Sequence, residues 1–190
     1  MRIVGGSARG RNLRSVPGNE TRPTSDRVRQ SLFDLLGQRC DGLRVLDLYA
    51  GTGALGLEAL SRGAAHATFV ESGKAAAEVI EANLRDLGFE PLGTLVRRDV
   101  DRALADLGAR KAAFDLIFAD PPYALAVSQK IADAIAAHGL LAGEGRAVIE
   151  RGKREAPPTP PQGFELYDDR AYGETVVAVL AKRMPAAPND

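Results

Sequence analysis

Apolar and polar positions follow two alternating patterns along most of this chain. Beyond residue 43, short runs rich in apolar residues, typical of buried strands, alternate with segments in which apolar residues recur every three or four positions, as on one face of a helix. The pattern predicts strands at 45–49, 67–71, 94–98, 114–119 and 146–150, and helices at 54–62, 74–87, 100–107 and 126–137. Repeated strand–helix–strand units of this length predict a parallel sheet covered by helices on both faces.

The two ends of the chain depart from this pattern. Residues 2–4 and 12–16 predict a short hairpin outside the main sheet, and helical spacing predicts a helix over 24–36 that carries Arg27 and Arg29 outward. Near the other end, 164–168 and 175–180 predict an antiparallel hairpin at one sheet edge, and 185–190 a disordered tail. We therefore expect a doubly wound, Rossmann-like α/β domain over 24–184, preceded by a small hairpin extension over 1–23.

Composition narrows the class of protein. The chain has 190 residues, of which 45% are hydrophobic and 26% charged, as in an ordinary globular domain. No apolar stretch approaches the roughly 18–20 residues of a membrane span, and a signal-peptide apolar region is lacking; we expect a cytoplasmic protein. The single cysteine, Cys40, excludes an internal disulfide and a cysteine-based zinc cluster. We expect a monomer without a metal.

Charge is distributed unevenly, although the net charge is zero. Residues 1–30 hold seven arginines against two acids, a net charge of +5, and the remaining residues hold 18 basic against 23 acidic side chains, a net charge of −5. A basic segment on an acidic body indicates a polyanionic partner met at one edge. Arginine favours forked contacts to phosphate. An arginine-rich surface that only faces solvent is the alternative.

A glycine-rich loop follows the first strand of the predicted sheet. Residues 51–56 match the dinucleotide fingerprint, and Glu71 follows 20 residues after Gly51, as in an NAD site. Asp47, four residues before Gly51, argues against a pyrophosphate: at an assumed 4 Å its repulsion of about 4 kcal/mol exceeds the 0.3–1 kcal/mol or so gained from a helix dipole. A cation reverses the sign. The sulfonium and amino groups of S-adenosylmethionine therefore suit this loop better than a dinucleotide does.

Further acids follow the predicted strands at their carboxyl ends, where ligands of doubly wound sheets bind. Glu71 can accept hydrogen bonds from both ribose hydroxyls. Asp99 can accept the adenine amine, with the Val100 backbone N–H beside it, and Asp120 ends the fourth strand. Polar residues at buried strand ends are costly unless they bind something. Helix capping is the alternative role for these acids.

The turn Asp120-Pro121-Pro122-Tyr123 predicts a grip for a planar amino group. Proline has no backbone donor, so the turn offers acceptors, namely the Asp120 carboxylate and the neighbouring carbonyls. Tyr123 adds a ring on which a flipped base can stack. A proline-rich turn with an acidic helix cap is the alternative interpretation.

These motifs together resemble the RsmD-type family of class I S-adenosylmethionine-dependent methyltransferases, which act on the N2 of a guanine in bacterial 16S ribosomal RNA. The glycine motif is shared by many methyltransferases, whereas the Arg-Pro-Thr block with the basic hairpin is more specific to this family. The resemblance covers nearly the whole chain and is carried by residues 2–6, 9–11, 22–29, 47–59 and 120–123.

The resemblance implies a set of roles. S-adenosylmethionine is the expected cofactor, and 16S ribosomal RNA, in the small subunit or an assembly intermediate, is the expected partner, with guanine 966 as the target. Asp120, Pro121, Pro122 and Tyr123 are expected to be catalytic. The expected cofactor site comprises Asp47, Tyr49, Gly51, Thr52, Gly53, Ala54, Glu71, Ser72, Asp99 and Val100. The expected RNA contacts are Arg2, Arg9, Arg11, Arg22, Thr24, Arg27 and Arg29.

Three other functions remain open from the sequence. A DNA or RNA adenine-N6 methyltransferase uses a similar acid-Pro-Pro-aromatic turn, but 190 residues leave no room for the separate target-recognition domain that a DNA enzyme would need. A dinucleotide-binding protein would rely on residues 51–56. A non-catalytic RNA-binding module would not require Asp120.

Overall fold

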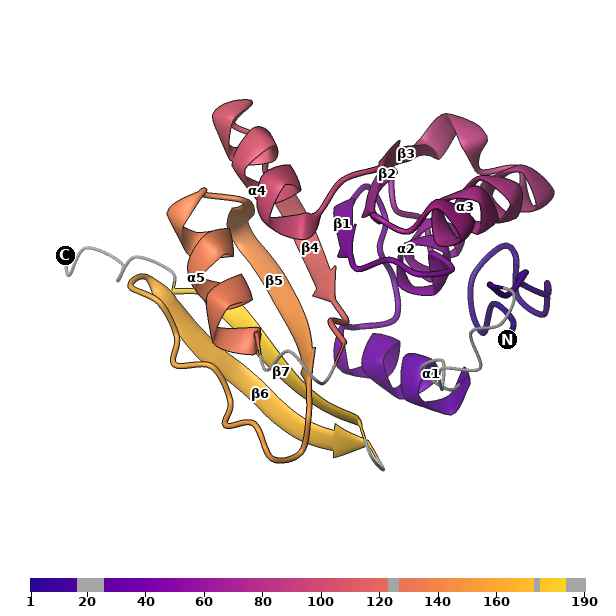
Figure 1. Cartoon of the computed structure of the whole chain (residues 1–190). Coiled ribbons are helices and arrows are strands. Elements are labelled where there is room, and N and C mark those ends of the chain that lie inside the picture. Colours follow the sequence, from indigo (N-terminus) through magenta and orange to yellow (C-terminus); the bar gives the residue numbers. More distant parts are fainter. Residues whose placement is uncertain (17–25, 123–126, 173–174, 184–190) are drawn as a thin grey trace, which may run out of the picture.

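A seven-stranded sheet forms the middle layer of the computed structural model, which describes residues 1–16, 26–122, 127–172 and 175–183 (Figure 1). The strand order is β3-β2-β1-β4-β5-β7-β6. The strands are β1 (Arg44–Leu48), β2 (His66–Val70), β3 (Gly93–Val96), β4 (Phe114–Ala119), β5 (Leu141–Arg151), β6 (Phe164–Tyr172) and β7 (Thr175–Lys182). The first five in chain order pair in parallel. The predicted doubly wound sheet is therefore confirmed.

Helices cover both faces of this sheet, as the sequence pattern predicts (Figure 1). Apolar residues of α1, α2 and α3 pack into one core, and those of α4 and α5 into the other. The helices are α1 (Asp26–Leu35), α2 (Ala54–Ser61), α3 (Lys74–Leu87), the 3₁₀ turn η1 (Glu90–Leu92), α4 (Val100–Ala109) and α5 (Ser128–Ala137). Within the described ranges, no helix is long and apolar enough to cross a membrane.

Successive strand residues supply the two cores alternately. In β1, Val45 belongs to the core beneath α1–α3 and Leu46 to the core beneath α4 and α5; Phe118 and Ile117 of β4 divide in the same way. This alternation follows from the two-residue period of a strand. Strands buried on both faces therefore read as continuous apolar runs.

The carboxyl-terminal hairpin extends the sheet in antiparallel pairing. β7 pairs with β5 on one side and with β6 on the other, so that β6 forms the sheet edge. The predicted edge hairpin is confirmed, although both of its strands, and β5 as well, are longer than the apolar pattern alone indicates. The predicted tail at 185–190 lies outside the described residues.

The N-terminal arm, residues 1–16, lies outside the sheet, as predicted. Its pairing is confirmed but short: it reduces to one antiparallel bridge, Arg2 with Asn12, with hydrogen bonds from Ile3 N to Arg11 O (2.9 Å) and from Leu13 N to Met1 O (3.0 Å). Ile3 and Leu13 are buried in the core beneath α1–α3. The arm is thus anchored by apolar burial rather than by a long hairpin ladder.

Candidate active site

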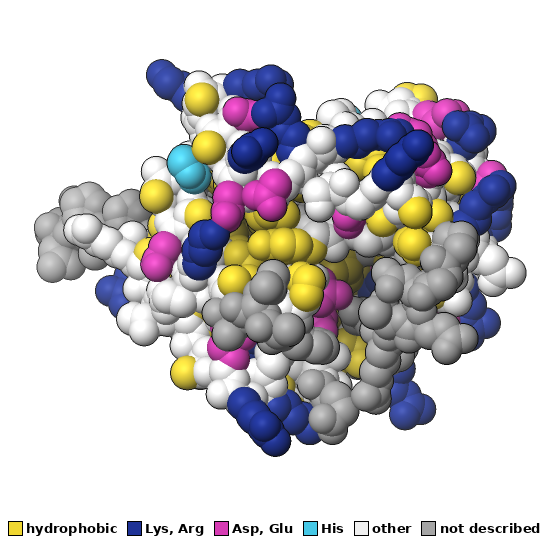
Figure 2. Space-filling view, in the orientation of Figure 1, with side chains coloured by type: hydrophobic (Ala, Val, Ile, Leu, Met, Phe, Trp, Pro, Cys, Tyr) yellow, Lys and Arg dark blue, Asp and Glu magenta, His cyan; other side chains and the backbone are white. Residues whose placement is uncertain are grey.

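The carboxyl ends of four neighbouring strands bring the acidic residues together. Leu48 of β1 pairs with Val70 of β2 and Ala119 of β4, so the residues that follow these strands, Glu71 and Asp120, lie on either side of β1. Figure 2 shows acidic side chains around an apolar area near the centre of this face, with basic side chains mainly toward the periphery. We call this region the acidic crevice and define it by Asp47, Glu71, Asp99 and Asp120.

The glycine loop has the backbone geometry that the fingerprint requires. Gly51 and Gly53 have φ values of 55° and 78°, in the left-handed region that favours glycine. A Cβ on Gly56 would overlap the Phe69 ring of β2. The last glycine therefore allows α2 to pack closely on β2, which brings the start of α2 to the strand ends. Ala54 is the first residue of that helix.

Glu71 ties the glycine loop to the end of β2. Its carboxylate accepts hydrogen bonds from Gly51 N (2.8 Å) and Gly73 N (2.7 Å). These contacts fix the carboxylate at the strand end, where a carboxylate can accept further bonds from ligand hydroxyls. Ser72, also predicted to contact the cofactor, is exposed beside it.

Asp47 is the most buried acid of the acidic crevice, with 2% of its surface exposed. Burial raises the pKa of Asp47 to about 8; the hydrogen bond from Gly56 N (2.9 Å) opposes this rise, and the nearby Asp120 and Glu71 carboxylates add to it. A buried carboxyl group of this kind gains a partner when a cation binds. The geometry therefore fits a positively charged ligand beside the glycine loop.

Tyr49 adopts an uncommon backbone conformation between Asp47 and the glycine loop. Its φ of 57° costs roughly 1–2 kcal/mol in a residue other than glycine, and such strain clusters at functional sites. Burial and then the carboxylates of Asp101 and Asp99 raise the pKa of Tyr49. The phenol thus lies near the start of α4.

Asp99 has the capping role that the sequence left open. It is the N-cap of α4, and its Oδ1 accepts a hydrogen bond from Asp101 N (3.0 Å). Val100, the first residue of α4, is buried. A capping aspartate retains acceptor capacity on its second oxygen, so the contact of Asp99 with adenine stays a prediction.

The Asp-Pro-Pro turn follows β4 directly. Asp120 N donates to Leu48 O (3.5 Å), a long contact that ties the turn to the end of β1. Asp120 is half-buried, Pro121 buried and Pro122 exposed. Tyr123 lies outside the described residues. Three of the four predicted catalytic residues therefore stand beside the strand that carries Asp47.

Comparisons with known proteins identify the family. A family model described as conserved hypothetical protein 95 matches residues 1–181. Escherichia coli K12 ribosomal RNA small subunit methyltransferase D is 34% identical over 92% of this chain and 86% of its own length. Bacillus subtilis YlbH, provisionally named an rRNA methyltransferase, is 37% identical over 96% of this chain and 100% of its own. The chain therefore belongs to the family of conserved hypothetical protein 95, which is the expected RsmD-type family.

The solved structures agree with this assignment to the RsmD-type family. Escherichia coli YhhF, provisionally described as a methyltransferase, superimposes with a TM-score of 0.84 at 31% identity, over 97% of this chain and 99% of its own. Thermus thermophilus TTHA0928, described as a hypothetical protein, gives 0.79 at 33% identity, over 94% and 98%. The predicted resemblance to class I methyltransferases is confirmed, and with it S-adenosylmethionine as the cofactor.

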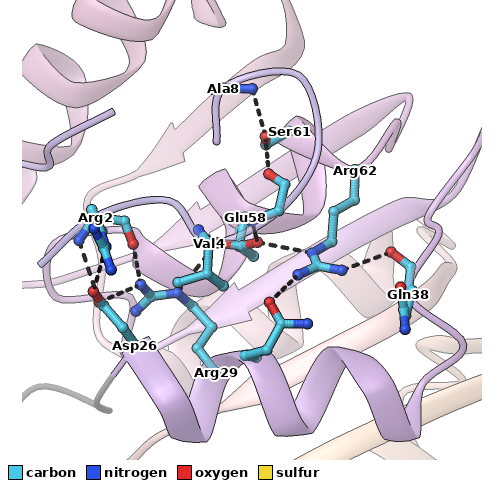
Figure 3. A network of polar contacts seen from close by, with 12 residues as sticks. Arg2, Val4, Ala8, Asp26, Arg29, Gln38, Glu58, Ser61 and Arg62 are labelled. Carbon is cyan, nitrogen blue, oxygen red and sulfur yellow. Dashed lines mark hydrogen bonds and ion pairs between the residues drawn. The ribbon is translucent and has the colours of Figure 1, made fainter. Parts of the chain in front are cut away.

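One RNA contact expected from the RsmD-type resemblance is placed wrongly by the sequence. Arg29 has no exposed surface. It shares the buried face of α1 with Leu32 and Phe33, three and four residues on, and its guanidinium pairs with Glu58 (Nε to Oε2, 3.3 Å) and Asp26 (Nη2 to Oδ1, 3.0 Å) (Figure 3). The expectation that Arg29 points outward is therefore wrong, and its role is structural.

The other predicted RNA contacts divide into paired and unpaired side chains. Arg2 pairs with Asp26 (3.3 Å) but stays largely exposed, and Arg11 donates to Asp86 O (2.6 Å). Arg9 and Arg27 are exposed, and neither has an ion pair within the described residues. Arg22 and Thr24 fall outside those residues. The positive charge of residues 1–30 is therefore only partly available to a ligand.

Glu58, which the sequence analysis does not single out, organises the contact between the arm and α2. It is fully buried and accepts hydrogen bonds from Val4 N (2.9 Å) and Gly5 N (2.7 Å) as well as from Arg62 Nε (2.8 Å) (Figure 3). A glutamate four residues before an arginine in an otherwise apolar helix was the available signal. Buried acids are almost always paired.

Asn83 is a second residue missed by the sequence analysis, and it connects the arm to the glycine loop. Its Nδ2 donates to Thr52 O (3.0 Å), and its Oδ1 accepts from Arg14 N (2.8 Å). Asn83 is buried on α3. The predicted cofactor residue Thr52 is thus held through its carbonyl. Nothing in the spacing of α3 distinguishes Asn83 from an ordinary polar residue.

Proposed function

We propose that this chain transfers a methyl group from S-adenosylmethionine to the exocyclic N2 of a guanine in 16S ribosomal RNA, with guanine 966 as the target implied by the resemblance. The observation that carries the proposal is the position of the Asp-Pro-Pro turn, joined through Asp120 N to Leu48 O, one residue beyond Asp47. The name of the Escherichia coli relative, a small subunit methyltransferase, supports ribosomal RNA as the substrate.

The Asp-Pro-Pro turn offers hydrogen-bond acceptors, and its two prolines offer no backbone N–H donors. Because Pro121 and Pro122 have no N–H, the Asp120 carboxylate and the Pro121 carbonyl can accept the two hydrogens of a planar amino group. Accepting both hydrogens favours a tetrahedral nitrogen whose lone pair points toward the glycine loop. When bound, S-adenosylmethionine supplies an activated methyl group. The protein contributes orientation of the nucleophile and exclusion of water.

Asp120 acts in this scheme as a hydrogen-bond acceptor. The amine nitrogen becomes positively charged as its bond to the methyl group forms, and the nearby carboxylates stabilise that charge. The proton can then leave to water, so Asp120 does not have to retain it. Removing this acceptor is expected to lower kcat, because the interaction strengthens only as the charge develops.

RNA contact is assigned to the arm and the start of α1. Of the predicted contacts, Arg2, Arg9, Arg11 and Arg27 are exposed, which suits phosphate binding. The arm, with the following loop up to residue 23, would serve as the RNA-binding extension of the methyltransferase domain. Arg29 supports this surface from beneath by holding the Arg2 carbonyl and Glu58.

The test is to map the transferred methyl group. Purified protein is incubated with methyl-labelled S-adenosylmethionine and small subunits from cells that lack this gene, or with free 16S ribosomal RNA, and the digested RNA is analysed by mass spectrometry. We expect label on N2 of one guanine. Label on N6 of an adenine would instead support the adenine methyltransferase reading. Subunits from cells with the active gene serve as an already methylated control.

A further inference from the structure

A cavity of about 690 Å³ lies between the arm, α1 and the end of α2. It is separate from the acidic crevice: the glycine loop precedes Ala54, whereas the cavity lies beside Leu60–Gly63, one helix length or about 12 Å farther along α2. Of its lining residues, Arg9 is the one RNA contact expected from the resemblance, and the sequence predicts no pocket here. Its polar lining comprises Ser7, Arg9, Gln30, Gln38, Arg39, Asp41, Ser61 and Arg62.

One wall of the cavity is fixed through Arg62. Its guanidinium donates to Glu58 Oε1 (2.8 Å), Gln38 O (3.0 Å) and Gln30 Oε1 (3.4 Å), and it lies 4.7 Å from the centre of the Phe33 ring. Figure 3 shows Arg62 spanning from Glu58 to Gln38. Because all of these groups are held by α1, α2 and the loop that joins α1 to β1, this wall exists before any ligand binds.

The arm forms the opposite wall and is held just as firmly. Ser7 N donates to Ser61 O (2.7 Å), Ala8 N donates to Ser61 Oγ (2.9 Å), and that hydroxyl donates to Gly5 O (2.6 Å). A Cβ on Gly6 would overlap the Ser61 carbonyl, and its φ of 73° also favours glycine. Gly6 therefore lets the arm approach the end of α2 closely enough to form one side of the cavity.

The lining chemistry suits a polar anion. Among the lining residues Val4 and Leu60 are the large apolar side chains, whereas three are arginines and one is an acid. The charge of Arg62 is balanced by Glu58, but Arg9 has no ion pair among the described residues, and Arg39 pairs only with the exposed Asp41 (2.5 Å). Exposed pairs contribute little, so Arg39 can exchange Asp41 for a phosphate. The Gln38 amide and the Ser7 hydroxyl can bind a base edge or ribose.

We propose that this cavity binds a nucleotide of the substrate RNA other than the target base, with Arg9 and Arg39 on its phosphates. The inference rests on the proposed function for its choice of RNA. A polymer is favoured over a free nucleotide because one wall of the cavity belongs to the arm, which also carries the exposed Arg2, Arg11 and Arg14. A nucleotide held here would fix the RNA at a second point, away from the guanine at Asp120.

The test compares two double variants that remove the same charge. Arg9→Ala with Arg39→Ala alters the cavity, and Arg110→Ala with Arg183→Ala removes exposed arginines at the end of α4 and just after β7. Binding of a labelled 16S ribosomal RNA transcript is measured by filter retention from 50 to 200 mM salt. We expect the cavity variant to raise Kd about tenfold or more and to reduce the salt slope by about two. Equal melting temperatures would show that both variants fold.

Two results would overturn the cavity assignment. One is an unchanged Kd and salt slope for the cavity variant, and the other is an equal loss in both variants, which would indicate nonspecific charge. Methyl transfer by the wild-type protein to small subunits is measured in parallel. If the wild type transfers methyl to RNA and the cavity variant binds RNA normally, only the cavity proposal fails. If the wild type transfers none, the proposed function fails independently.

Discussion

The acidic crevice and the N-terminal arm are both built from charged residues, but they use charge in opposite ways. In the acidic crevice, backbone N–H groups of the glycine loop and of α2 donate to the Asp47 and Glu71 carboxylates near the strand ends. Next to the arm, Arg29 of α1 is buried, pairs with Glu58 of α2 and donates to the Arg2 carbonyl, so that its charge stabilises the fold. The comparison shows that a count of arginines does not distinguish side chains that anchor the fold from side chains that can contact a ligand.

The largest expected effect comes from two arginines two residues apart on α1. Arg29→Ala should lower the free energy of unfolding by about 3–5 kcal/mol, because it leaves the buried Glu58 without one of its partners. The exposed Arg27→Ala should change it by less than about 0.5 kcal/mol and should weaken RNA binding. Urea unfolding measures the first difference, and RNA filter binding the second. Equal stability losses would mean that burial does not separate these residues.

The next largest effect concerns the acidic crevice. Asp120→Ala should lower kcat by about 10²–10³-fold, the usual loss for one preorganised polar contact in the transition state, while S-adenosylmethionine binds as before. Asp115→Ala is the matched control: Asp115 lies on the same strand, at its amino end, and accepts from Arg44 N (2.8 Å). Steady-state methyl transfer at saturating substrate gives kcat. A similar decrease in both variants would contradict a specific role for Asp120.

Asn83 tests the link between the two regions. Asn83→Ala should cost about 1–3 kcal/mol of stability, because Thr52 O and Arg14 N would lose a buried partner. S-adenosylmethionine should also bind more weakly, since the glycine loop loses one support. Asn12→Ala, an exposed change in the same arm, should alter neither quantity. An unchanged cofactor affinity in the Asn83 variant would show that the glycine loop holds its shape without the arm.

The smallest effect is a pH dependence. Because burial raises the pKa of Asp47 to about 8, a cationic ligand must displace a proton below that pH. Affinity for S-adenosylmethionine should therefore rise with pH by up to about tenfold per unit as pH approaches 8, and level off above it. Methylthioadenosine, which lacks both positive groups, should show no such rise in calorimetry. A flat profile for both ligands would remove Asp47 from contact with the cation.

The same shift predicts the sign of a stability effect. The folded-state pKa of Asp47, about 8, lies above its ordinary value of 3.8, so the folded protein retains a proton that the unfolded chain has lost. This contribution is fully present below pH 3.8 and declines as pH rises toward 8. Without ligand, Asp47→Asn should therefore gain stability relative to the wild type across this range. Urea unfolding at pH 5 and pH 8 measures the change.

The sequence predicts the parts of the site that depend on local spacing. The glycine loop, Glu71 and the Asp-Pro-Pro turn each follow a strand. The topology of a parallel sheet brings the carboxyl ends of its strands to the same edge, whatever the side-chain packing. The burial of Arg29 could also be predicted from the sequence, because Leu32 and Phe33 lie on the same face of the helix. The RNA role that the resemblance implies for Arg29 led to the opposite expectation.

Long-range contacts explain what the sequence could not supply. Glu58 accepts from Val4 and Gly5, more than fifty residues away, and Asn83 reaches both Thr52 and Arg14. Such partners are fixed by the packing of the arm onto α2 and α3, and no local pattern encodes that packing. The capping contact of Asp99 was anticipated as an alternative, but only the geometry of α4 decides it.

Ligand binding by calorimetry tests the central claim most directly, namely that the acidic crevice selects a cation beside the glycine loop. The wild-type protein is titrated with S-adenosylmethionine and with NADH at pH 8. The account predicts one site for S-adenosylmethionine, weakened by Asp47→Asn, and no measurable binding of NADH. Two results would contradict it. One is binding of NADH by the wild type with an affinity comparable to that for S-adenosylmethionine. The other is a wild type that binds no S-adenosylmethionine, together with an Asp47 variant that binds NADH more tightly than the wild type does.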